Sequence, residues 1–442
     1  MKEKLIIHNF AGISDIELEL GDINILIGPQ ATGKSICAKS LYYFKSFTSD
    51  IFSAVRNNKH IDEFNKMFID KFNEYFPPQS WPASFSIRYE IKCESDQILF
   101  IQVKKQSKST FNVRLTYSDY YKNLYETLYD DFSSLRKSSF LENQPRNVLY
   151  VKEYEINRLF QEKLKKEISP LGNRRQLFIP AGRSFFGILQ SSIFTFLASN
   201  TTIDPFLKSF GSFLENIKHF GIDFYELSER YTKKNAQKKI IKEQVDQLIE
   251  AILKGKYVYE KDKDYLLYQD GRKTLLANAS SGQQETLPLA IILRSFVTQR
   301  MYSWEAFTIY IEEPEAHIFP TAQKEIVQLI SLVYNFYRDE PLQFVITTHS
   351  PYILTEFNNL LYAGIIEEKL TRKRKNKTEL YKLVSKEQIL NPNKIKCYSL
   401  DNGSYQSLIS TDTGLITSDV IDAVSDEFSF QFGDLLDLDS KL

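Results

Sequence analysis

Ile23–Ser35, which reads INILIGPQATGKS, is the stretch from which the fold of this chain can be predicted. A short, mostly apolar strand is followed by a Gly-rich loop and then by the start of a helix. Gly28, Gly33, Lys34 and Ser35 match G-x-x-x-x-G-K-[ST], the phosphate-binding P-loop. The four variable positions hold Pro29, Gln30, Ala31 and Thr32. The alternative is an ordinary glycine-containing turn, but the strand directly upstream favours the P-loop.

Each residue type in this motif has a chemical reason to be there. Glycines let successive backbone N–H groups point at one phosphate, and the following helix adds its positive N-terminal end. Lys34 would reach the β- and γ-phosphates, and the Ser35 hydroxyl would ligate Mg²⁺. Because the chain has no Asn-Lys-x-Asp motif to read a guanine base, we expect ATP rather than GTP.

Composition excludes several other classes of protein. At 442 residues the chain can hold a large core, and two lobes are expected rather than one compact domain. Lys plus Arg and Asp plus Glu both number 56, so net charge favours neither nucleic acid nor a membrane. Cys37, Cys93 and Cys397 fit no metal spacing, which favours reduced thiols in a cytoplasmic protein. No apolar run approaches about 18 residues, so no membrane association is predicted.

Hydrophobic periodicity predicts strands that alternate with helices. Apolar residues at every second position from Phe85 to Cys93 predict an antiparallel β-meander over 83–117. Further strands are expected at 4–10, 15–20, 176–179, 257–260, 264–268, 273–276, 307–311 and 344–347. Helices are expected from 34 to about 47, over 119–170 in two pieces broken around Pro145, across 204–253, from Pro288 to about 299, and from about 320. Around the P-loop this alternation indicates an α/β domain with a mostly parallel central sheet.

Two carboxylates follow the apolar strand at 307–311. Glu312 and Glu313 would lie at the C-terminal end of a core strand, where ligands bind in open α/β sheets. One carboxylate there can hold Mg²⁺, and the next can orient and deprotonate the attacking water. The alternative is a solvated acidic turn.

A histidine and a Ser/Gly-rich turn complete the set of motifs. His349 follows the strand at 344–347, where it could hydrogen-bond the γ-phosphate or the attacking water, or could be structural. Residues 280–285, Ser-Ser-Gly-Gln-Gln-Glu, precede an apolar helix. They offer either a second anion site at a helix N-terminus or only a well-capped helix start.

The order of these motifs resembles that of the ATP-binding-cassette (ABC) ATPases, in which signature loop, Walker B strand and switch histidine follow the P-loop. Asn9-Phe10, at a strand end shortly before the P-loop, resembles RecF, SMC-type heads and OLD-family ATPases. The stretch 180–184, Pro-Ala-Gly-Arg-Ser, and the form EEPEAH at 312–317 look most like OLD-like ATPases of bacterial anti-phage systems, such as PARIS, Septu and some retrons. The resemblance covers the motifs and framing strands from Lys4 to about Gly364.

This resemblance implies an ABC-type P-loop ATPase head with inserted helical segments. The mostly parallel central sheet would be joined by the antiparallel β-meander. We divide the chain into an N-terminal ATPase lobe at 1–118, a mainly helical insert or arm at 119–255, a C-terminal ATPase lobe at 256–364 and a C-terminal extension at 365–442.

Residue by residue, the resemblance also implies roles. Glu312 would be the Walker B metal carboxylate, Glu313 the catalytic base and His349 the switch residue. Residues 28–35 would bind phosphates and Mg²⁺. Ser281 and Gly282 of the signature loop would contact the γ-phosphate held by the opposite subunit. Ser280 and Gln283 beside them are also expected to bind the nucleotide.

Two further features of the resemblance bear on the site. Arg183 is predicted to take part in the nucleotide or dimer contact. Glu312 stands where many ABC proteins have Asp, so its side chain is one methylene longer. The Q-loop glutamine of the family has no clear counterpart here.

The leading interpretation is an ATP-dependent sensor or scaffold in anti-phage defence. Two heads would sandwich ATP, and the assembly would control a separately encoded effector such as a nuclease. A transport ATPase is disfavoured by the wide separation of Lys34 and Ser280.

Two rival interpretations rest on single stretches of sequence. A DNA-repair or recombination ATPase is favoured by the basic run at 369–377, although this run can equally be a solvated loop. A built-in Toprim nuclease would need an Asp-x-Asp pair, which Asp437-Leu438-Asp439 matches by letter only. Too little chain follows it, so we interpret the residues from Asp419 onward as an acidic amphipathic tail that packs on its own head or docks a partner.

Overall fold

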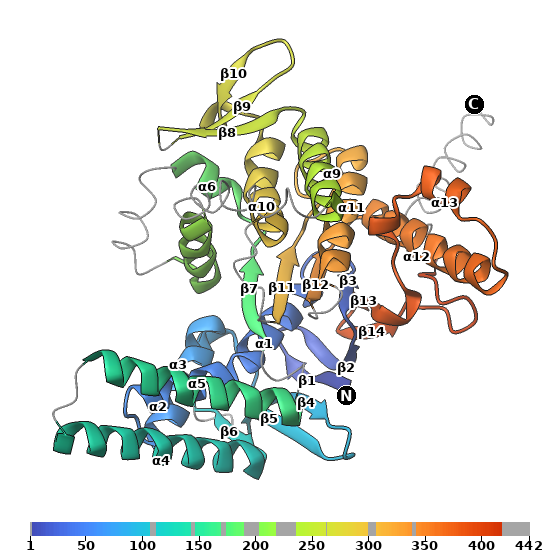
Figure 1. Cartoon of the computed structure of the whole chain (residues 1–442). Coiled ribbons are helices and arrows are strands. Elements are labelled where there is room, and N and C mark those ends of the chain that lie inside the picture. The colour runs from blue at the N-terminus through green and yellow to red at the C-terminus, as the bar shows by residue number, and fades with distance from the viewer. Residues whose placement is uncertain are drawn as a thin grey trace.

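The P-loop strand lies inside a six-stranded sheet at the centre of the computed structural model (Figure 1). The structure describes residues 2–106, 112–142, 146–168, 174–189, 203–217, 236–261, 263–298, 306–337 and 342–417. The sheet has the order β14-β13-β3-β12-β11-β7. Its strands are, in that order, Ser404–Ser407, Ile395–Asp401, Ile23–Ile27, Gln343–Thr348, Phe307–Glu312 and Arg175–Ile179. Only β14 pairs in the antiparallel sense, so the predicted α/β fold with a mostly parallel central sheet is confirmed.

A second sheet is antiparallel and has five strands in the order β2-β1-β4-β5-β6. They are Ile13–Leu20, Lys2–Phe10, Phe85–Lys92, Ile98–Lys105 and Arg114–Tyr117. The last three confirm the predicted β-meander. In the register, Leu5 lies opposite Leu18 on one side and Tyr89 on the other, and all three side chains are buried. A third, small sheet has the order β10-β9-β8 and confirms three predicted short strands, at Lys273–Leu275, Lys263–Leu267 and Lys256–Glu260.

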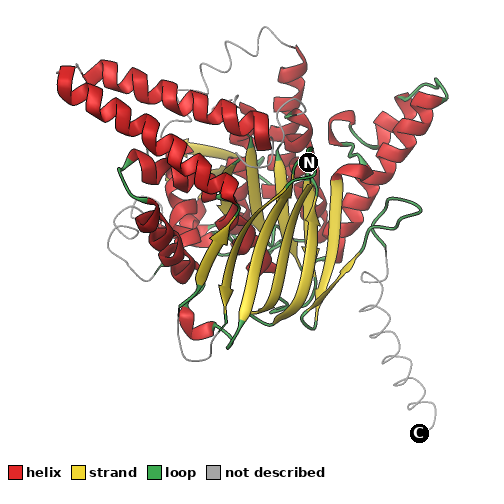
Figure 2. Cartoon of the chain, turned by 90° about the horizontal axis from the view of Figure 1, so that it is seen from below, coloured by secondary structure: helices red, strands yellow, loops and turns green. Residues whose placement is uncertain are grey.

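Helices pack around these sheets, as Figure 2 shows. They are α1 (Lys34–Lys45), α2 (Phe47–Arg56), α3 (Ile61–Tyr75), α4 (Asp119–Glu142), α5 (Arg146–Ile168), α6 (Ser184–Leu189), residues 205–217, α9 (Ala236–Leu253), α10 (Ser281–Thr298), α11 (Pro320–Phe336), α12 (Pro351–Arg372) and α13 (Thr378–Leu383). Short 3₁₀ turns lie at Pro78–Ser80, Leu276–Asn278, Lys386–Gln388 and Pro392–Lys394. The two predicted helical pieces within 119–170 are α4 and α5, and Pro145 lies outside the described residues.

One helix boundary differs from the prediction. We expected an apolar helix only after Pro288, but α10 begins at Ser281 and contains Pro288. Proline has no N–H, so one backbone hydrogen bond of the helix is lost at this point. Leu287 and Leu289 on either side are buried, and this packing holds the helix together.

The central strands are apolar throughout because both of their faces are covered. Ile23, Ile25 and Ile27 belong to one hydrophobic core, which also contains buried residues of α9 to α12. Leu26, between them, belongs to a second core together with residues of α1 to α5 and of the antiparallel sheet. Successive side chains of a strand point to opposite faces, so a strand between two cores reads as a continuous apolar run.

A buried polar cluster joins the two large sheets. Lys45, at the end of α1, donates to Glu3 Oε1 of β1 at 2.6 Å. Gln343 Nε2 of β12 donates to Glu3 Oε2 at 2.7 Å, and the Tyr89 hydroxyl of β4 donates to Glu3 Oε1 at 2.7 Å. The side chains of Lys45 and Glu3 are each 1 % exposed. We call Glu3, Lys45, Tyr89 and Gln343 the core cluster.

The segment expected as a C-terminal extension contributes to the central sheet. β13 pairs in parallel with the P-loop strand β3, for example Cys397 with Ile25. All four segments of the predicted division therefore supply strands to this sheet. The acidic tail, including Asp437 and Asp439, lies outside the described residues.

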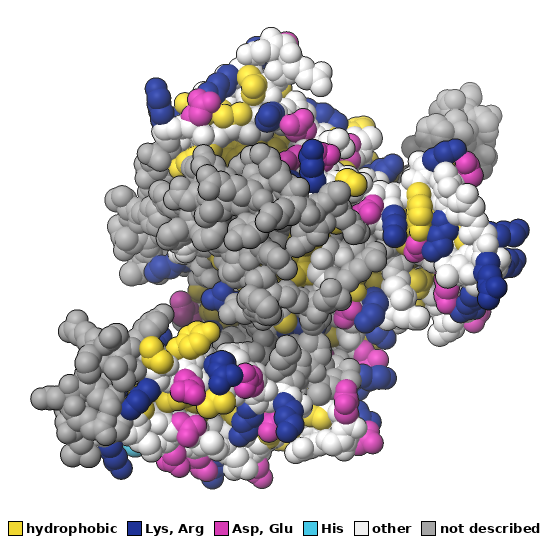
Figure 3. Space-filling view, in the orientation of Figure 1, with side chains coloured by type: hydrophobic (Ala, Val, Ile, Leu, Met, Phe, Trp, Pro, Cys, Tyr) yellow, Lys and Arg dark blue, Asp and Glu magenta, His cyan; other side chains and the backbone are white. Residues whose placement is uncertain are grey.

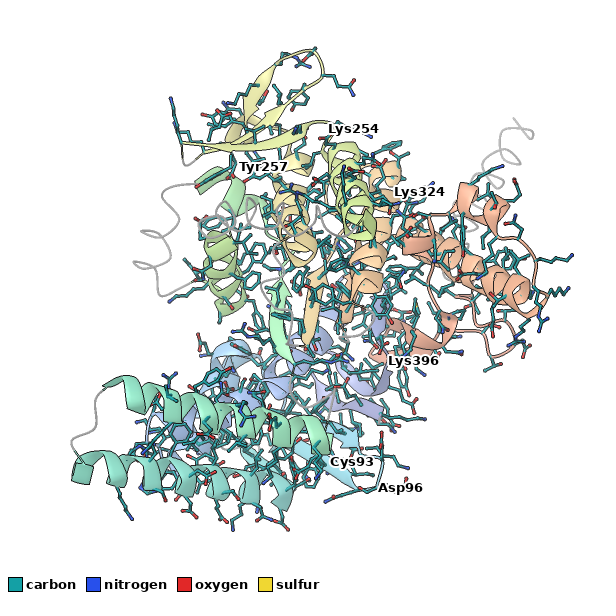
Figure 4. The ribbon with its side chains drawn as sticks, in the orientation of Figure 1. Cys93, Asp96, Lys254, Tyr257, Lys324 and Lys396 are labelled. Carbon is teal, nitrogen blue, oxygen red and sulfur yellow. The ribbon has the colours of Figure 1, made fainter. Side chains whose placement is uncertain are left out.

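The three cysteines are free thiols. Cys37 and Cys397 are buried, and Cys93 lies beside Asp96 at the turn between β4 and β5 (Figure 4). Burial raises the pKa of the Cys37 thiol to about 12, so this group stays protonated at neutral pH. Within the described part of the chain, no helix is long and apolar enough to cross a membrane.

Candidate active site

The P-loop connects β3 to α1 through two glycines that no other residue could replace. Gly28 has φ 151°, and a Cβ atom there would lie 2.1 Å from the carbonyl oxygen of Leu400 in β13. Gly33 has φ 95°, and a Cβ atom there would lie 2.6 Å from Ile13 Cγ1. Both positions have positive φ and are crowded, so the fold of the loop itself requires glycine at each of them.

Lys34 is the first residue of α1 and is 5 % exposed. Its ammonium group donates to the carbonyl oxygens of Gly28 at 2.8 Å and Pro29 at 2.6 Å. Burial lowers its pKa, while the nearby carboxylates of Glu313 and Glu315 act in the opposite direction. Neutral carbonyl oxygens therefore hold this ammonium group inside the loop. A phosphate oxygen is negatively charged and could replace them as a stronger hydrogen-bond acceptor.

His349 connects the P-loop to the strand end of β11. Its Nδ1 lies 3.4 Å from Lys34 Nζ, and its Nε2 lies 3.2 Å from Glu313 Oε1. The histidine and glutamate side chains are 28 % and 40 % exposed. The structure therefore brings together Lys34, His349 and Glu313, which the sequence placed in three separate motifs. We call these three residues the site cluster.

Glu315 was not assigned a role from the sequence, and the structure gives it one. Its Oε1 accepts from the Thr348 hydroxyl at 2.8 Å and from the backbone N–H of His349 at 2.6 Å. Glu315 therefore fixes the loop that carries the histidine. The only signal in the sequence was a third carboxylate, two residues after Glu313.

The contacts of Glu312 and Ser35 show whether these residues could hold Mg²⁺. Glu312 is 8 % exposed, and its Oε1 is buried with no hydrogen-bond partner within the described residues. Ser35 is exposed at the start of α1. A carboxylate oxygen without a donor and a free hydroxyl are ligands of the type that Mg²⁺ prefers, so these residues fit the cation. No group of three or more metal-binding side chains is found in the described ranges, so water and phosphate would have to complete the coordination.

The signature loop lies at the start of α10. Ser280 and Ser281 are exposed, and a Cβ atom on Gly282 would lie 2.5 Å from the carbonyl oxygen of His317. The loop therefore rests on the segment that follows Glu313. Gln283 donates to the carbonyl oxygen of Leu253 at 2.7 Å and accepts from Ser280 N at 3.2 Å, and its predicted role in nucleotide binding stays a prediction.

The side chain of Arg183 contacts the backbone of its own chain, and its predicted role stays a prediction. Arg183 was expected to contact the nucleotide or a second subunit, but its side chain is 0 % exposed. Its guanidinium donates to backbone carbonyl oxygens of Pro180, Glu312, Glu313 and Glu285. A planar fork with several donors suits this kind of buried bridge better than a mobile phosphate contact.

Comparison with known proteins gives a family match and matches to solved structures. The family model of the AAA ATPase domain matches residues 1–354. No curated protein matches the chain. The SMC head domain from Thermotoga maritima aligns at 8 % identity and a TM-score of 0.35, covering 92 % of this chain and 97 % of its own. The recombination mediator RecF aligns in its ATP form at 12 % and 0.35, covering 92 % and 99 %. Its ATPrS form aligns at 11 % and 0.33, covering 92 % and 98 %.

Proposed function

The chain belongs to the AAA ATPase domain family, and from that premise we propose that it hydrolyses ATP with Mg²⁺ as cofactor. The observation that carries this proposal is the site cluster, in which Lys34, His349 and Glu313 form one line of polar contacts at 3.4 Å and 3.2 Å. Phosphoryl transfer to water uses a cation that neutralises the phosphates and a group that orients the attacking water and accepts its proton, and here an imidazole lies between the two.

Each residue of the site cluster is proposed to have a distinct role in hydrolysis. Lys34 exchanges its carbonyl partners for the β- and γ-phosphates and neutralises charge that grows during transfer. Glu313 orients the attacking water and accepts its proton. His349, next to both, hydrogen-bonds the γ-phosphate or the water. Mg²⁺, held by Ser35 and Glu312, would supply charge neutralisation between the phosphates.

We further propose that two copies enclose ATP, so the protein works as at least a homodimer. Ser280 and Ser281 are exposed, and among the described residues no hydrogen bond joins either of them to the P-loop of their own chain. The N-terminus of an 18-residue helix also favours an anion at this point. The γ-phosphate bound by a second copy would meet both requirements.

The assembly is proposed to control a separately encoded effector, such as a nuclease, in anti-phage defence in the cytoplasm. This finer proposal is supported by the resemblance of residues 180–184 and 312–317 to OLD-like ATPases. Hydrolysis that opens a two-headed assembly would move or release a partner.

A second candidate function, direct action on DNA, is favoured by the surface of one segment. Lys369, Arg372, Lys373, Arg374 and Lys375 are exposed at the end of α12 and in the loop that leads to α13. Figure 3 shows the Lys and Arg side chains gathered on this projecting part of the molecule. Among the described residues, Lys373, Arg374 and Lys375 form no ion pair, so their charge is available to a polyanion.

The test of the dimer uses two inactive variants. Lys34→Ala removes the P-loop cation, and Ser281→Arg places a bulky cation at the signature loop. Each variant alone should be inactive, whereas a mixture should regain part of the activity because a mixed dimer contains one intact composite site. Absence of rescue at every mixing ratio would contradict the two-headed site.

The test of the second candidate compares two triple variants with equal loss of charge. Lys373→Ala/Arg374→Ala/Lys375→Ala should weaken DNA binding if the segment contacts phosphates. The slope of log K against the logarithm of the salt concentration should then become less steep by about 3. Lys254→Ala/Lys324→Ala/Lys396→Ala removes three lysines that lie away from this segment (Figure 4) and should leave binding unchanged. Equal effects of the two variants would argue against a DNA site on this segment.

The proposal of a separately encoded nuclease has its own test. Cleavage of plasmid DNA or tRNA by the purified chain would contradict it.

A further inference from the structure

Arg183 joins two motifs that lie far apart in the sequence. On one side, its Nη1 donates to the carbonyl oxygen of Glu312 at 2.6 Å and its Nη2 to that of Glu313 at 3.0 Å. On the other side, its Nε donates to the carbonyl oxygen of Glu285 at 3.2 Å. One side chain therefore touches the strand end that carries the catalytic base and the helix that begins at the signature loop.

Glu285 completes the bridge from the side of α10. Its Oε1 accepts from the backbone N–H of Arg183 at 3.0 Å, and its Oε2 accepts from that of Ser184 at 2.8 Å. The side chains of Arg183 and Glu285 are 0 % and 2 % exposed, with Nε and Oε1 at 3.5 Å. A buried charge pair of this kind holds its geometry tightly, because either charge without the other would be costly.

The backbone at Glu313 is unusual and depends on this bridge. Glu313 has φ 43°, a left-handed conformation that non-glycine residues rarely adopt. Its N–H donates to the carbonyl oxygen of Thr347 at 2.8 Å, and its own carbonyl oxygen accepts from Arg183. The peptide groups on both sides of Glu313 are thus anchored by hydrogen bonds. Arg183 contributes one on each side, in addition to those from Glu313 N–H to Thr347 and from Ala316 N–H to the Glu313 carbonyl oxygen.

The other end of the bridge lies close to the signature loop. Glu285 is four residues after Ser281, about one turn into α10. Gly282 rests on the carbonyl oxygen of His317, so a shift of the loop would also press on the segment after Glu313. A contact made at Ser281 therefore has a short, buried route to the backbone that carries the base.

We propose that Arg183 is a positioning residue that couples the signature loop to the catalytic carboxylate of Glu313. When a γ-phosphate engages Ser281, α10 is fixed, and Arg183 passes that constraint to the backbone of Glu312 and Glu313. Hydrolysis is then efficient only in an assembled site. This inference rests on the proposed function, since it needs hydrolysis at a site shared by two copies.

The test compares Arg183→Lys with the matched control Arg294→Lys. Arg294 also anchors α10, through Asp246 of α9 at 2.6 Å, but its side chain is partly exposed and lies nearer the C-terminal end of the helix than Glu285. Lysine keeps the charge at Arg183 and loses the fork that reaches several carbonyls. We expect kcat to fall by about 10- to 100-fold, because small misplacements of a reacting group have effects of this size. Nucleotide affinity and ATP-dependent assembly should stay within about 3-fold of the wild type, and Arg294→Lys should keep its kcat.

This pattern separates coupling from a purely structural role. If Arg183 only stabilises the fold, Arg183→Lys should lower nucleotide affinity, assembly and kcat together with the melting temperature. Equal kcat values for Arg183→Lys and the control would overturn the proposal. If Arg183→Lys does not fold, Glu285→Gln decides in its place, because it keeps the shape of the side chain and one acceptor oxygen. The same loss of kcat with assembly retained supports the coupling, and an unchanged kcat overturns it.

A second readout does not depend on hydrolysis and so distinguishes this inference from the proposed function. In the Ser281→Arg background the direct contact with a second copy is blocked, and ATP should still add hydrogen-exchange protection at 312–316 and, through Arg183, at 281–287. Adding Arg183→Lys should abolish the protection at 281–287 only. If the protection at 281–287 persists, the coupling is wrong, even if the wild-type chain hydrolyses ATP. If this protection disappears although the wild-type chain shows no hydrolysis, the coupling stands and only the proposed function fails.

Discussion

The core cluster and the site cluster use the same residue types for opposite purposes. Each contains a buried lysine from α1 and a glutamate, and each includes a residue that lies in β12 or directly follows it. In the core cluster both oxygens of Glu3 accept hydrogen bonds, and Lys45 and Glu3 are 1 % exposed. In the site cluster Lys34 contacts carbonyl oxygens, an imidazole and, at 3.5 Å, the Thr32 hydroxyl, but no carboxylate within the described residues, and Glu313 is 40 % exposed.

The surroundings of the two clusters differ in the same way. Around the site cluster, Glu312 Oε1, Glu315 Oε2 and Thr347 Oγ1 are buried without a hydrogen-bond partner in the described structure. Buried polar atoms without partners are costly in a folded protein, so a group of them at one place indicates a site completed by a ligand. The carboxylate of the core cluster is hydrogen-bonded at both oxygens, whereas carboxylate oxygens beside the site cluster lack a partner in the described structure.

The largest effect should come from Lys34→Ala. We expect ATP turnover to fall by at least about 10³-fold, because the cation that stabilises the transferring phosphoryl group is lost. The free energy of unfolding should change little, since the partners of Lys34 are carbonyls of its own loop. Phosphate release and chemical denaturation measure the two quantities, and turnover at the wild-type rate would remove the P-loop assignment.

Glu313→Gln should have the next largest effect. Glutamine keeps the size of the side chain but cannot accept the proton of the attacking water, so kcat should fall by about 10²- to 10³-fold. ATP-bound dimers should accumulate, which particle mass with and without ATP would reveal. A parallel loss of nucleotide occupancy and assembly would instead mark Glu313 as structural.

Glu3→Gln makes the same substitution in the core cluster and should have the opposite outcome. It leaves Lys45 buried without its counter-charge, so the free energy of unfolding should fall by about 3 kcal/mol. Turnover per folded molecule should remain that of the wild type. Urea unfolding together with active-site titration measures both, and lost turnover in fully folded protein would contradict the separation of the clusters.

The smallest expected effect is in the acid stability of the core cluster. Burial opposes ionisation of Glu3, but attraction to Lys45 and Arg174 and hydrogen bonds from Lys45 and Gln343 hold its pKa below the ordinary 4.5. A lowered folded-state pKa gives stability that is present above 4.5 and is lost as pH falls further. Below pH 4.5 the wild type should lose up to about 1.4 kcal/mol per pH unit from this group, and Glu3→Gln should lack that slope.

The residues of the site cluster could be predicted from the sequence because of a general property of parallel sheets. β3, β11 and β12 are each apolar runs, and their C-terminal ends lie at one edge of the sheet, so the polar residues that follow must converge. Lys34, Glu313 and His349 were found in this way. The nucleotide, the metal and the second copy follow from the family and stay predictions for this chain.

The features that were missed depend on contacts across long stretches of sequence. β13 has an ordinary strand pattern, and nothing local to Ile395–Asp401 indicates that it pairs with the P-loop strand. The burial of Arg183 was not predicted, because a motif does not reveal which side chains are buried. Pro288 was taken as a helix start because the packing of Leu287 and Leu289, which outweighs the lost hydrogen bond, is visible only in three dimensions.

The pairing of β13 with β3 also determines when, during synthesis of the chain, the central sheet can be completed. A ribosome makes the P-loop strand early and reaches Asp401 only after the rest of the ATPase motifs. At about 5–20 residues per second, translation from Ile27 to Asp401 takes roughly 20–75 s. During that time one edge of β3 has no partner, and Leu400 is not yet present to close against Gly28. A nascent chain therefore carries an open strand edge, a template for wrong pairing, until the last strands of the sheet arrive.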